Sequence, residues 1–147
     1  MKQFEDVFAE IQTEWVELCM EYVPDADKIF MYASCEKRVY SFDAFYMIDG
    51  VVAMTNEVNT VSGHSYDDSM DRQMALLEEG TEKIIVMHDL FKEYEREMPT
   101  EIKLIYDVTN NSLEGEYSYE IKYTNTVDIT PGDIFEEWFE EVKKNHS

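Results

Sequence analysis

Apolar side chains in this sequence change from helical to extended spacing and back several times, and this alternation limits the fold more than any single motif. Over residues 4–22 they recur every three or four positions, which predicts an amphipathic helix that ends at Pro24. Residues 28–34 and 38–48 are instead rich in β-branched and aromatic side chains. That composition predicts two strands, joined by a turn over residues 35–37.

The middle of the chain combines a hairpin signal with a long helical pattern. Asp49-Gly50 is a strong two-residue hairpin sequence, so we expect a third strand over residues 51–58. A polar segment follows, and residues 69–98 then return to helical spacing. Gly80 lies within this region, and it either separates two helices or forms a weak point in one long helix.

Two further strands and a helix complete the pattern. Apolar and polar residues alternate over 102–108 and again over 113–123, where the alternation predicts a strand with one face in solvent. We expect Thr130 to cap the last helix, with Pro131 as its first residue and Asp133 as the acidic partner of the cap.

The elements predicted in this way follow the order α-β-β-β-α-β-β-α. Strands joined by short turns pair as antiparallel neighbours, and the amphipathic helices need an apolar surface to cover. We therefore expect an α+β fold, a mostly antiparallel sheet covered by helices. No internal repeat or low-complexity linker divides the sequence, and we expect a single domain over residues 1–147.

The net charge is the clearest functional signal. The chain carries 33 Asp and Glu against 12 Lys and Arg, a formal charge of -21 at pH 7. Phosphates and anionic membrane surfaces would be repelled, so we expect neither nucleic acid nor a membrane as partner. The sequence contains no signal segment and no apolar run that could cross a bilayer, which favours a cytoplasmic location. The charge favours a basic partner, although acidity can also serve solubility alone.

The residues that commonly perform catalysis do not form a recognisable motif. His64 lies in the polar segment, His88 flanks the apolar stripe of the middle helix, and His146 lies near the end of the chain. Cys19 belongs to an apolar helix face, whereas Cys35 lies in a predicted turn, where it could be an exposed thiol. We therefore predict no catalytic residues, no cofactor and no enzyme activity.

Metal binding is a weaker alternative that the acidic residues leave open. Residues 107–118 partly resemble a calcium loop, but Ser112 replaces the required glycine and Ser118 replaces the final glutamate, so a hairpin turn explains them better. Asp67, Asp68 and Asp71 together supply enough carboxylates for a hard cation. Such clusters on a surface usually remain solvated, and we predict no metal site.

The acidic residues gather in two segments, which we take as the candidate partner-binding surface. Carboxylates of this kind can steer a basic protein to its binding site and repel phosphates. The candidate residues are Asp67, Asp68, Asp71, Glu78 and Glu79 in the first segment, and Glu114, Glu116, Glu120, Asp128 and Glu137 in the second.

The overall arrangement resembles the YezG-like immunity proteins, which are acidic antitoxins of Gram-positive bacteria. The resemblance rests on the amphipathic first helix, the strand KIFMYAS with an aromatic strand after it, the helix HDLFKEYEREM, the step from Pro99 into a strand, and the hairpin that ends in EGEYSYE. It covers most of the chain and is clearest over residues 28–34 and 87–123.

The resemblance implies an antitoxin without catalytic residues. Such proteins neutralise secreted toxin domains, often nucleases, inside the cell that makes them. On this interpretation the acidic surface binds the cognate toxin's basic face and excludes its substrate. Two other functions stay open from the residues alone. One is an acidic adaptor or regulatory module without a toxin partner, and the other is a hydrolase with a metal ion at Asp67–Asp71.

Overall fold

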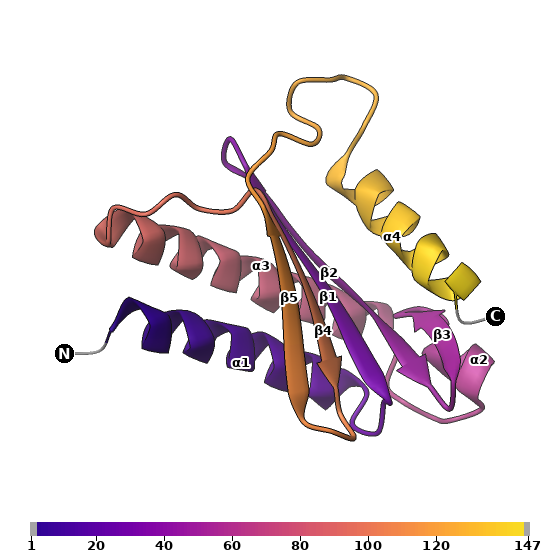
Figure 1. Ribbon diagram of the computed structural model, residues 1–147. Helices are drawn as coiled ribbons and strands as arrows, with labels where there is room; N and C mark the ends of the chain where they lie inside the picture. Colours follow the sequence, from indigo (N-terminus) through magenta and orange to yellow (C-terminus); the bar gives the residue numbers. More distant parts are fainter. Residues whose placement is uncertain (1–2, 146–147) are drawn as a thin grey trace.

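The computed structural model describes residues 3–145 and has the predicted α+β fold (Figure 1). Its five strands form one antiparallel sheet in the order β3-β2-β1-β4-β5. The elements are α1 (Phe4–Tyr22), β1 (Lys28–Glu36), β2 (Val39–Ile48), β3 (Val51–Met54), α2 (Val58–Ser62), α3 (Met70–Glu93), β4 (Glu101–Asp107), β5 (Ser112–Ser118) and α4 (Pro131–Asn145).

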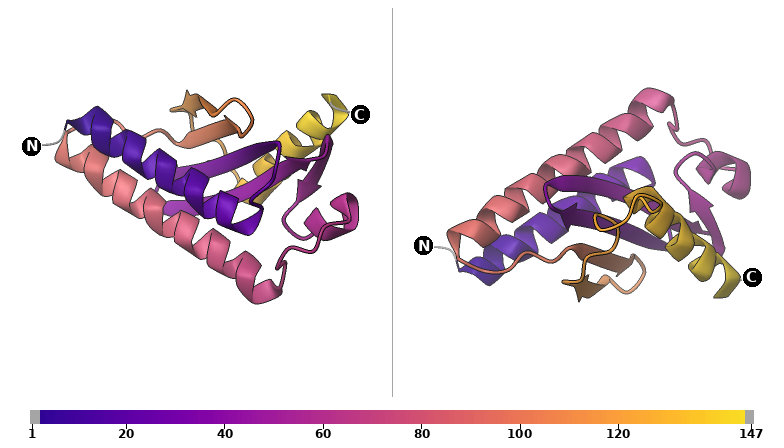
Figure 2. Two further views of the ribbon diagram at one scale, coloured as in Figure 1. Left: turned by 90° about the horizontal axis from the view of Figure 1, so that it is seen from below. Right: turned by 90° about the horizontal axis from the view of Figure 1, so that it is seen from above.

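The helices cover both faces of the sheet. α1 and α3 lie side by side on one face and α4 lies on the other (Figure 2). Side chains of β1 alternate between these layers, with Ile29 and Met31 packed toward α1 and α3 and Phe30 and Tyr32 packed toward α4. β1 is thus covered on both sides, and it divides the core into two layers.

The turns explain where two of the strands begin and end. Asp49 and Gly50 both have positive φ, as the predicted hairpin requires. The expected turn over residues 35–37 is wrong by about two residues. β1 continues to Glu36, and Lys37 and Arg38 turn the chain with positive φ. Cys35 therefore lies buried in the strand and is not an exposed thiol.

The third strand is shorter than expected because its last residues bond locally. The Glu57 carboxylate accepts the Met54 backbone N–H at 2.9 Å, which closes a turn directly after β3. Val58 is then fully buried and begins α2, where the sequence predicted continued strand and a polar break. The strand prediction over residues 51–58 is therefore wrong after Met54.

The fifth strand also ends early, at Ser118 instead of residue 123, because Glu36 captures the chain beyond it. One Glu36 oxygen accepts the Lys122 N–H at 2.8 Å, and the other accepts the N–H groups of Tyr123 and Thr124 and the Thr124 hydroxyl. Burial alone would raise the pKa of the Glu36 carboxyl, but these hydrogen bonds outweigh it and hold the pKa below its ordinary value. The carboxylate thus fixes the segment that leads to α4.

Gly80 lies within one continuous α3, which settles the alternative that the sequence left open. A Cβ at this position would lie 2.1 Å from the Phe42 ring of β2. The Gly80 carbonyl also accepts the Trp15 indole N–H of α1 at 3.1 Å. The glycine is thus explained by close packing of α3 on its neighbours, and not by a helix end.

The last helix begins as predicted. The Asp133 N–H donates to the Thr130 hydroxyl at 3.2 Å, and the Asp133 carboxylate accepts the Thr130 N–H at 2.9 Å. This reciprocal pair sets the first turn of α4. His146 lies outside the described residues. None of the helices over residues 3–145 combines the length and the apolar character needed to span a bilayer.

Candidate functional site

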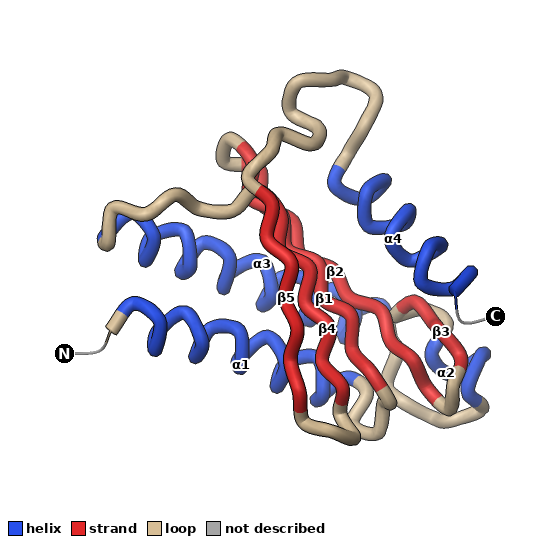
Figure 3. The backbone as a smooth tube through the Cα atoms, in the orientation of Figure 1, coloured by secondary structure: helices blue, strands red, loops and turns tan. Residues whose placement is uncertain are grey.

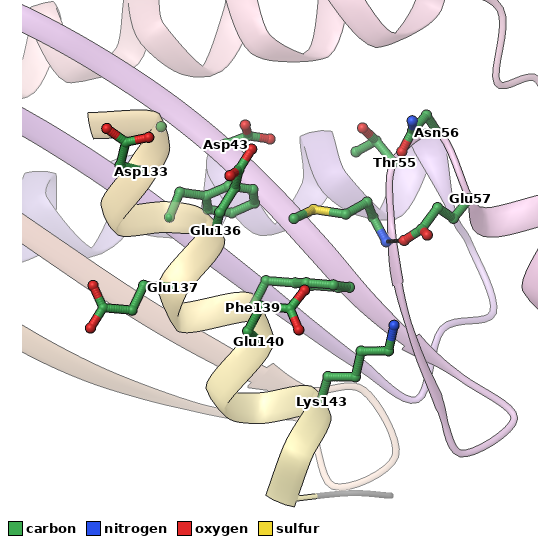
Figure 4. A pocket seen from close by; sticks show the side chains of 13 residues that line it. Asp43, Thr55, Asn56, Glu57, Asp133, Glu136, Glu137, Phe139, Glu140 and Lys143 are labelled. Carbon is green, nitrogen blue, oxygen red and sulfur yellow. Dashed lines mark hydrogen bonds between the residues drawn. The ribbon is translucent and has the colours of Figure 1, made fainter. Parts of the chain in front are cut away.

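An acidic groove of about 690 Å³ runs between α4 and the β2–β3 side of the sheet (Figure 4). We define this acidic groove by five carboxylate residues of its lining, Asp43, Glu57, Asp133, Glu136 and Glu140. Glu137 also lines it, but its carboxylate points to the other side of α4 (Figure 4). Lys143 is the one basic residue in its lining. The carboxylates come from β2, from the turn after β3 and from α4, so the tertiary fold brings them together.

The apolar side of α4 holds these carboxylates in place. Phe135, Trp138 and Phe139 are buried against the sheet, where all three rings contact Phe45 with centroids 5.1–5.7 Å apart. Helical spacing then leaves the acidic residues of α4 on its remaining faces. Aromatic packing therefore sets the position of α4 and of the helix faces that carry its carboxylates.

Asp43 is the most perturbed carboxylate of the groove. It lies in β2 among apolar residues, and its carboxylate accepts the neighbouring Ala44 N–H at 2.8 Å. Burial raises the pKa of Asp43 to about 6, and the negative charge of Glu136 adds to this effect. In Figure 4, Glu136 points toward Asp43, whereas Glu137 points to the other side of α4. A cation placed between Asp43 and Glu136 would relieve their repulsion.

Three predicted residues of the second acidic segment lie on the α4 side of the sheet. Glu114 and Glu116 of β5 pair with Ile105 and Lys103 of β4, whose side chains pack toward α4. Directly paired residues of antiparallel strands point to the same face, so both glutamates face the α4 side. Glu137 joins them from α4, next to Lys103 in a second groove of about 310 Å³.

The other two residues of this segment lie in the loop between β5 and α4. Both Glu120 and Asp128 are exposed. Glu120 lies 3.8 Å from the Lys122 ammonium. The Asp128 N–H donates to the Thr126 hydroxyl at 3.2 Å. Neither residue lines the acidic groove.

The first acidic segment divides into two parts in the structure. Asp67, Asp68 and Asp71 lie at the start of α3, where the Asp67 carboxylate accepts the Ser69 N–H at 3.2 Å. Hydrogen bonds from Ser69 hold the pKa of Asp67 below its ordinary value. This local role at a helix start explains Asp67 without a partner. Within residues 3–145, no group of three or more His, Cys, Asp and Glu is placed to hold a metal ion.

The second part of this segment lies farther along α3. Glu78 and Glu79 are exposed there, and Glu79 faces α1 across a shallow groove. Glu14, Glu17 and Glu21 of α1 line the same groove, where Glu14 pairs with Lys83 at 2.7 Å. The face of the molecule formed by α1 and α3 therefore also carries a row of glutamates on α1, which lies outside the two acidic segments predicted from the sequence.

Sequence reasoning missed Asp43 and Glu57, as well as this row on α1. A single charged residue inside the apolar strand of residues 38–48 was the available signal for Asp43. The α1 glutamates recur at the spacing of one helix face, which is a signal for the row. No pattern marks Glu57, because its position depends on the unexpected end of β3.

The histidines of the described chain serve structural contacts. The His64 ring lies 3.1 Å from the Asp49 carboxylate and stacks on Tyr66, which connects the polar segment to the β2–β3 hairpin. His88 is half-buried, and its Nδ1 lies 2.9 Å from the Tyr40 hydroxyl.

Both cysteines are buried free thiols. Burial raises the pKa of Cys19 to about 12 and also raises the pKa of Cys35. Since the thiolate is the nucleophilic form, neither thiol is activated for attack. Comparison of the chain with protein-family models and with curated proteins finds no match.

Proposed function

We propose that the protein is a cytosolic immunity protein that binds a basic toxin domain and neutralises it. The observation that supports this most is the acidic groove, in which carboxylates from three parts of the chain face one space. Rigidly held charges of one sign speed the encounter with an oppositely charged protein and reject wrong partners. The net charge of -21 extends the same preference over the whole molecule.

Asp43 supports a basic side chain as the group that enters the groove. An arginine or lysine of the partner that reached Asp43 and Glu136 would form charge-assisted hydrogen bonds with both carboxylates. Asp43 would then release the proton that its raised pKa lets it hold near pH 6. On this proposal, complex formation releases protons near pH 6, and calorimetry in two buffers of different ionisation enthalpy measures that release.

Neutralisation follows from competition for the same basic surface. A nuclease binds phosphates through lysines and arginines, and carboxylates placed on that surface occupy the same groups. The protein then needs no catalytic residue, because occupation of the substrate site is sufficient. A toxin with another substrate would be inhibited in this way only if its active site were basic too.

Co-expression with the products of neighbouring open reading frames tests the proposal. We expect one product to arrest growth alone, to be tolerated with this protein, and to co-purify with it. The dissociation constant should rise steeply between 50 and 500 mM NaCl, because salt screens the attraction. Absence of a complex at low salt would contradict the proposal, and a complex with a harmless basic protein would leave only the adaptor function.

A pair of matched variants tests whether the groove is the binding surface. Asp43→Asn with Glu136→Gln removes two charges from the acidic groove, and Glu78→Gln with Glu79→Gln removes two from α3 on the other side of the sheet. We expect the first pair to weaken binding at least about tenfold and the second less than about threefold. Equal effects would point to the net charge alone.

A further inference from the structure

The two edges of the sheet are protected to different extents. The β3 edge has only four residues, and Glu57 and α2 close it directly after Met54. The β5 edge has seven residues, six of them exposed and the seventh half-buried. Figures 2 and 3 show β5 as the outermost strand, with no described helix along its outer side. An edge strand of this kind presents unpaired backbone N–H and C=O groups that can pair with another strand.

The two faces of β5 differ in chemistry. Glu114 and Glu116 point to the α4 side, as their pairing with β4 requires. Leu113 and Tyr117 point to the α1 side and remain 39% and 44% exposed. Tyr117 is held there by the Gln12 amide, which donates to its hydroxyl at 2.7 Å. The edge therefore alternates between a face that carries Glu114 and Glu116 and a face that carries Leu113, Gly115 and Tyr117.

This alternation excludes a second copy of the chain as the strand that pairs here. Two β5 edges side by side would place glutamates of both copies on the same face at neighbouring positions, and like charges across strands are destabilising. Each copy also carries a charge of -21. A strand with basic residues on that face would instead form a favourable cross-strand charge pair with each glutamate.

We propose that the β5 edge binds an extended basic segment of the partner protein by strand addition. Lysines or arginines of that segment would lie beside Glu114 and Glu116, and its alternate apolar residues would lie beside Leu113 and Tyr117. Backbone hydrogen bonds supply affinity in this mode, and alternate side chains supply specificity. The inference rests on the proposed function, since it takes the partner to be basic.

Two synthetic peptides of identical composition test strand addition. In one, lysine alternates with valine over eight residues, and in the other four lysines precede four valines. We expect the alternating peptide to bind the full chain at least about tenfold more tightly at 50 mM NaCl. Amide NMR shifts and slowed hydrogen exchange should concentrate in Ser112–Ser118. The same affinity for both peptides, or shifts spread over the helices, would overturn strand addition and leave the proposed function untouched.

Charge reversal of the edge supplies the matched test. Glu114→Lys with Glu116→Lys should abolish binding of the lysine peptide and create binding of a peptide in which glutamate alternates with valine. Asp89→Lys with Glu93→Lys makes the same charge change at exposed residues of α3 that lie outside both acidic segments, and it should keep the original preference. Failure of the reversed edge to bind the glutamate peptide, with the fold intact by circular dichroism, would overturn the inference. If neither peptide binds the unmodified chain, strand addition is wrong, and the co-expression experiment alone then decides the proposed function.

Discussion

Gly80 shows how one residue can be required by packing inside a helix. An alanine Cβ would lie 2.1 Å from the Phe42 ring, which is itself buried. An approach this close belongs in the upper part of the about 1–3 kcal/mol that overpacking costs, and alanine regains only roughly 1 kcal/mol over glycine in a helix. We expect Gly80→Ala to lower the free energy of unfolding by about 1–2 kcal/mol in urea titrations. Glu79→Ala, exposed on the same helix, should change it by less than about 0.5 kcal/mol.

Asp43 gives a prediction about pH. Its pKa of about 6 lies above the ordinary aspartate value, so the folded state holds the proton more tightly than the unfolded chain. The stability from this proton is complete below about pH 4 and is lost as the pH rises through 6. Asparagine does not titrate, so the Asp43→Asn variant does not lose this stability as the pH rises. We expect the variant to become more stable than the original chain as the pH rises from 4 to 7.5, by at most about 3 kcal/mol.

Urea unfolding of both proteins at pH 4, 5, 6 and 7.5 measures this difference. Glu137→Gln is the matched control, since Glu137 points to the other side of α4 (Figure 4). Its stability should follow that of the original chain over the whole range. Parallel curves for Asp43→Asn and the original chain would show that Asp43 holds no extra proton in the fold.

At the scale of elements, α4 depends on a few aromatic contacts. Trp138 packs on Phe30 and Phe45 with ring centroids 5.9 and 5.1 Å apart, and the Lys103 ammonium lies 5.4 Å from its ring. Trp138→Ala should therefore cost about 3–5 kcal/mol and speed amide exchange throughout α4. Glu141→Ala, exposed on the same helix, should cost less than about 0.5 kcal/mol. A loss below 1 kcal/mol for Trp138→Ala would show that α4 is held by other contacts.

The elements were largely predictable because their signals are local. The period of apolar residues identified α1 and the strands, and the dipeptide Asp49-Gly50 identified a turn. The ends of β3 and β5 were not predictable, because carboxylates that bond to the backbone decide them. Glu36 shows the reason most clearly, since its partners lie more than 80 positions away in the sequence. For the same reason the acidic groove needed the tertiary structure, whereas Glu137 could be found from charge alone.

At the scale of the whole molecule, charge opposes folding and favours binding. A net charge of -21 repels itself, and salt screens this repulsion as the Debye length falls from roughly 10 Å at 0.1 M to 3 Å at 1 M. We expect the free energy of unfolding to rise by about 1 kcal/mol over this range of NaCl. Glu17→Lys with Glu21→Lys should reduce the dependence on salt. A urea midpoint that does not change with the NaCl concentration would show that self-repulsion does not lower the stability of the fold.

The bond between Glu36 and the segment before α4 also bears on the order of biosynthesis. A ribosome makes β1 and β2 well before it makes α4, so the aromatic face around Phe30 and Phe45 is complete while its cover is still absent. Glu36 lies at the end of β1 and binds residues 122–124, which precede α4 in the chain. This bond holds the start of α4 close to the exposed aromatic face, so α4 has only a short distance to search before it covers that face.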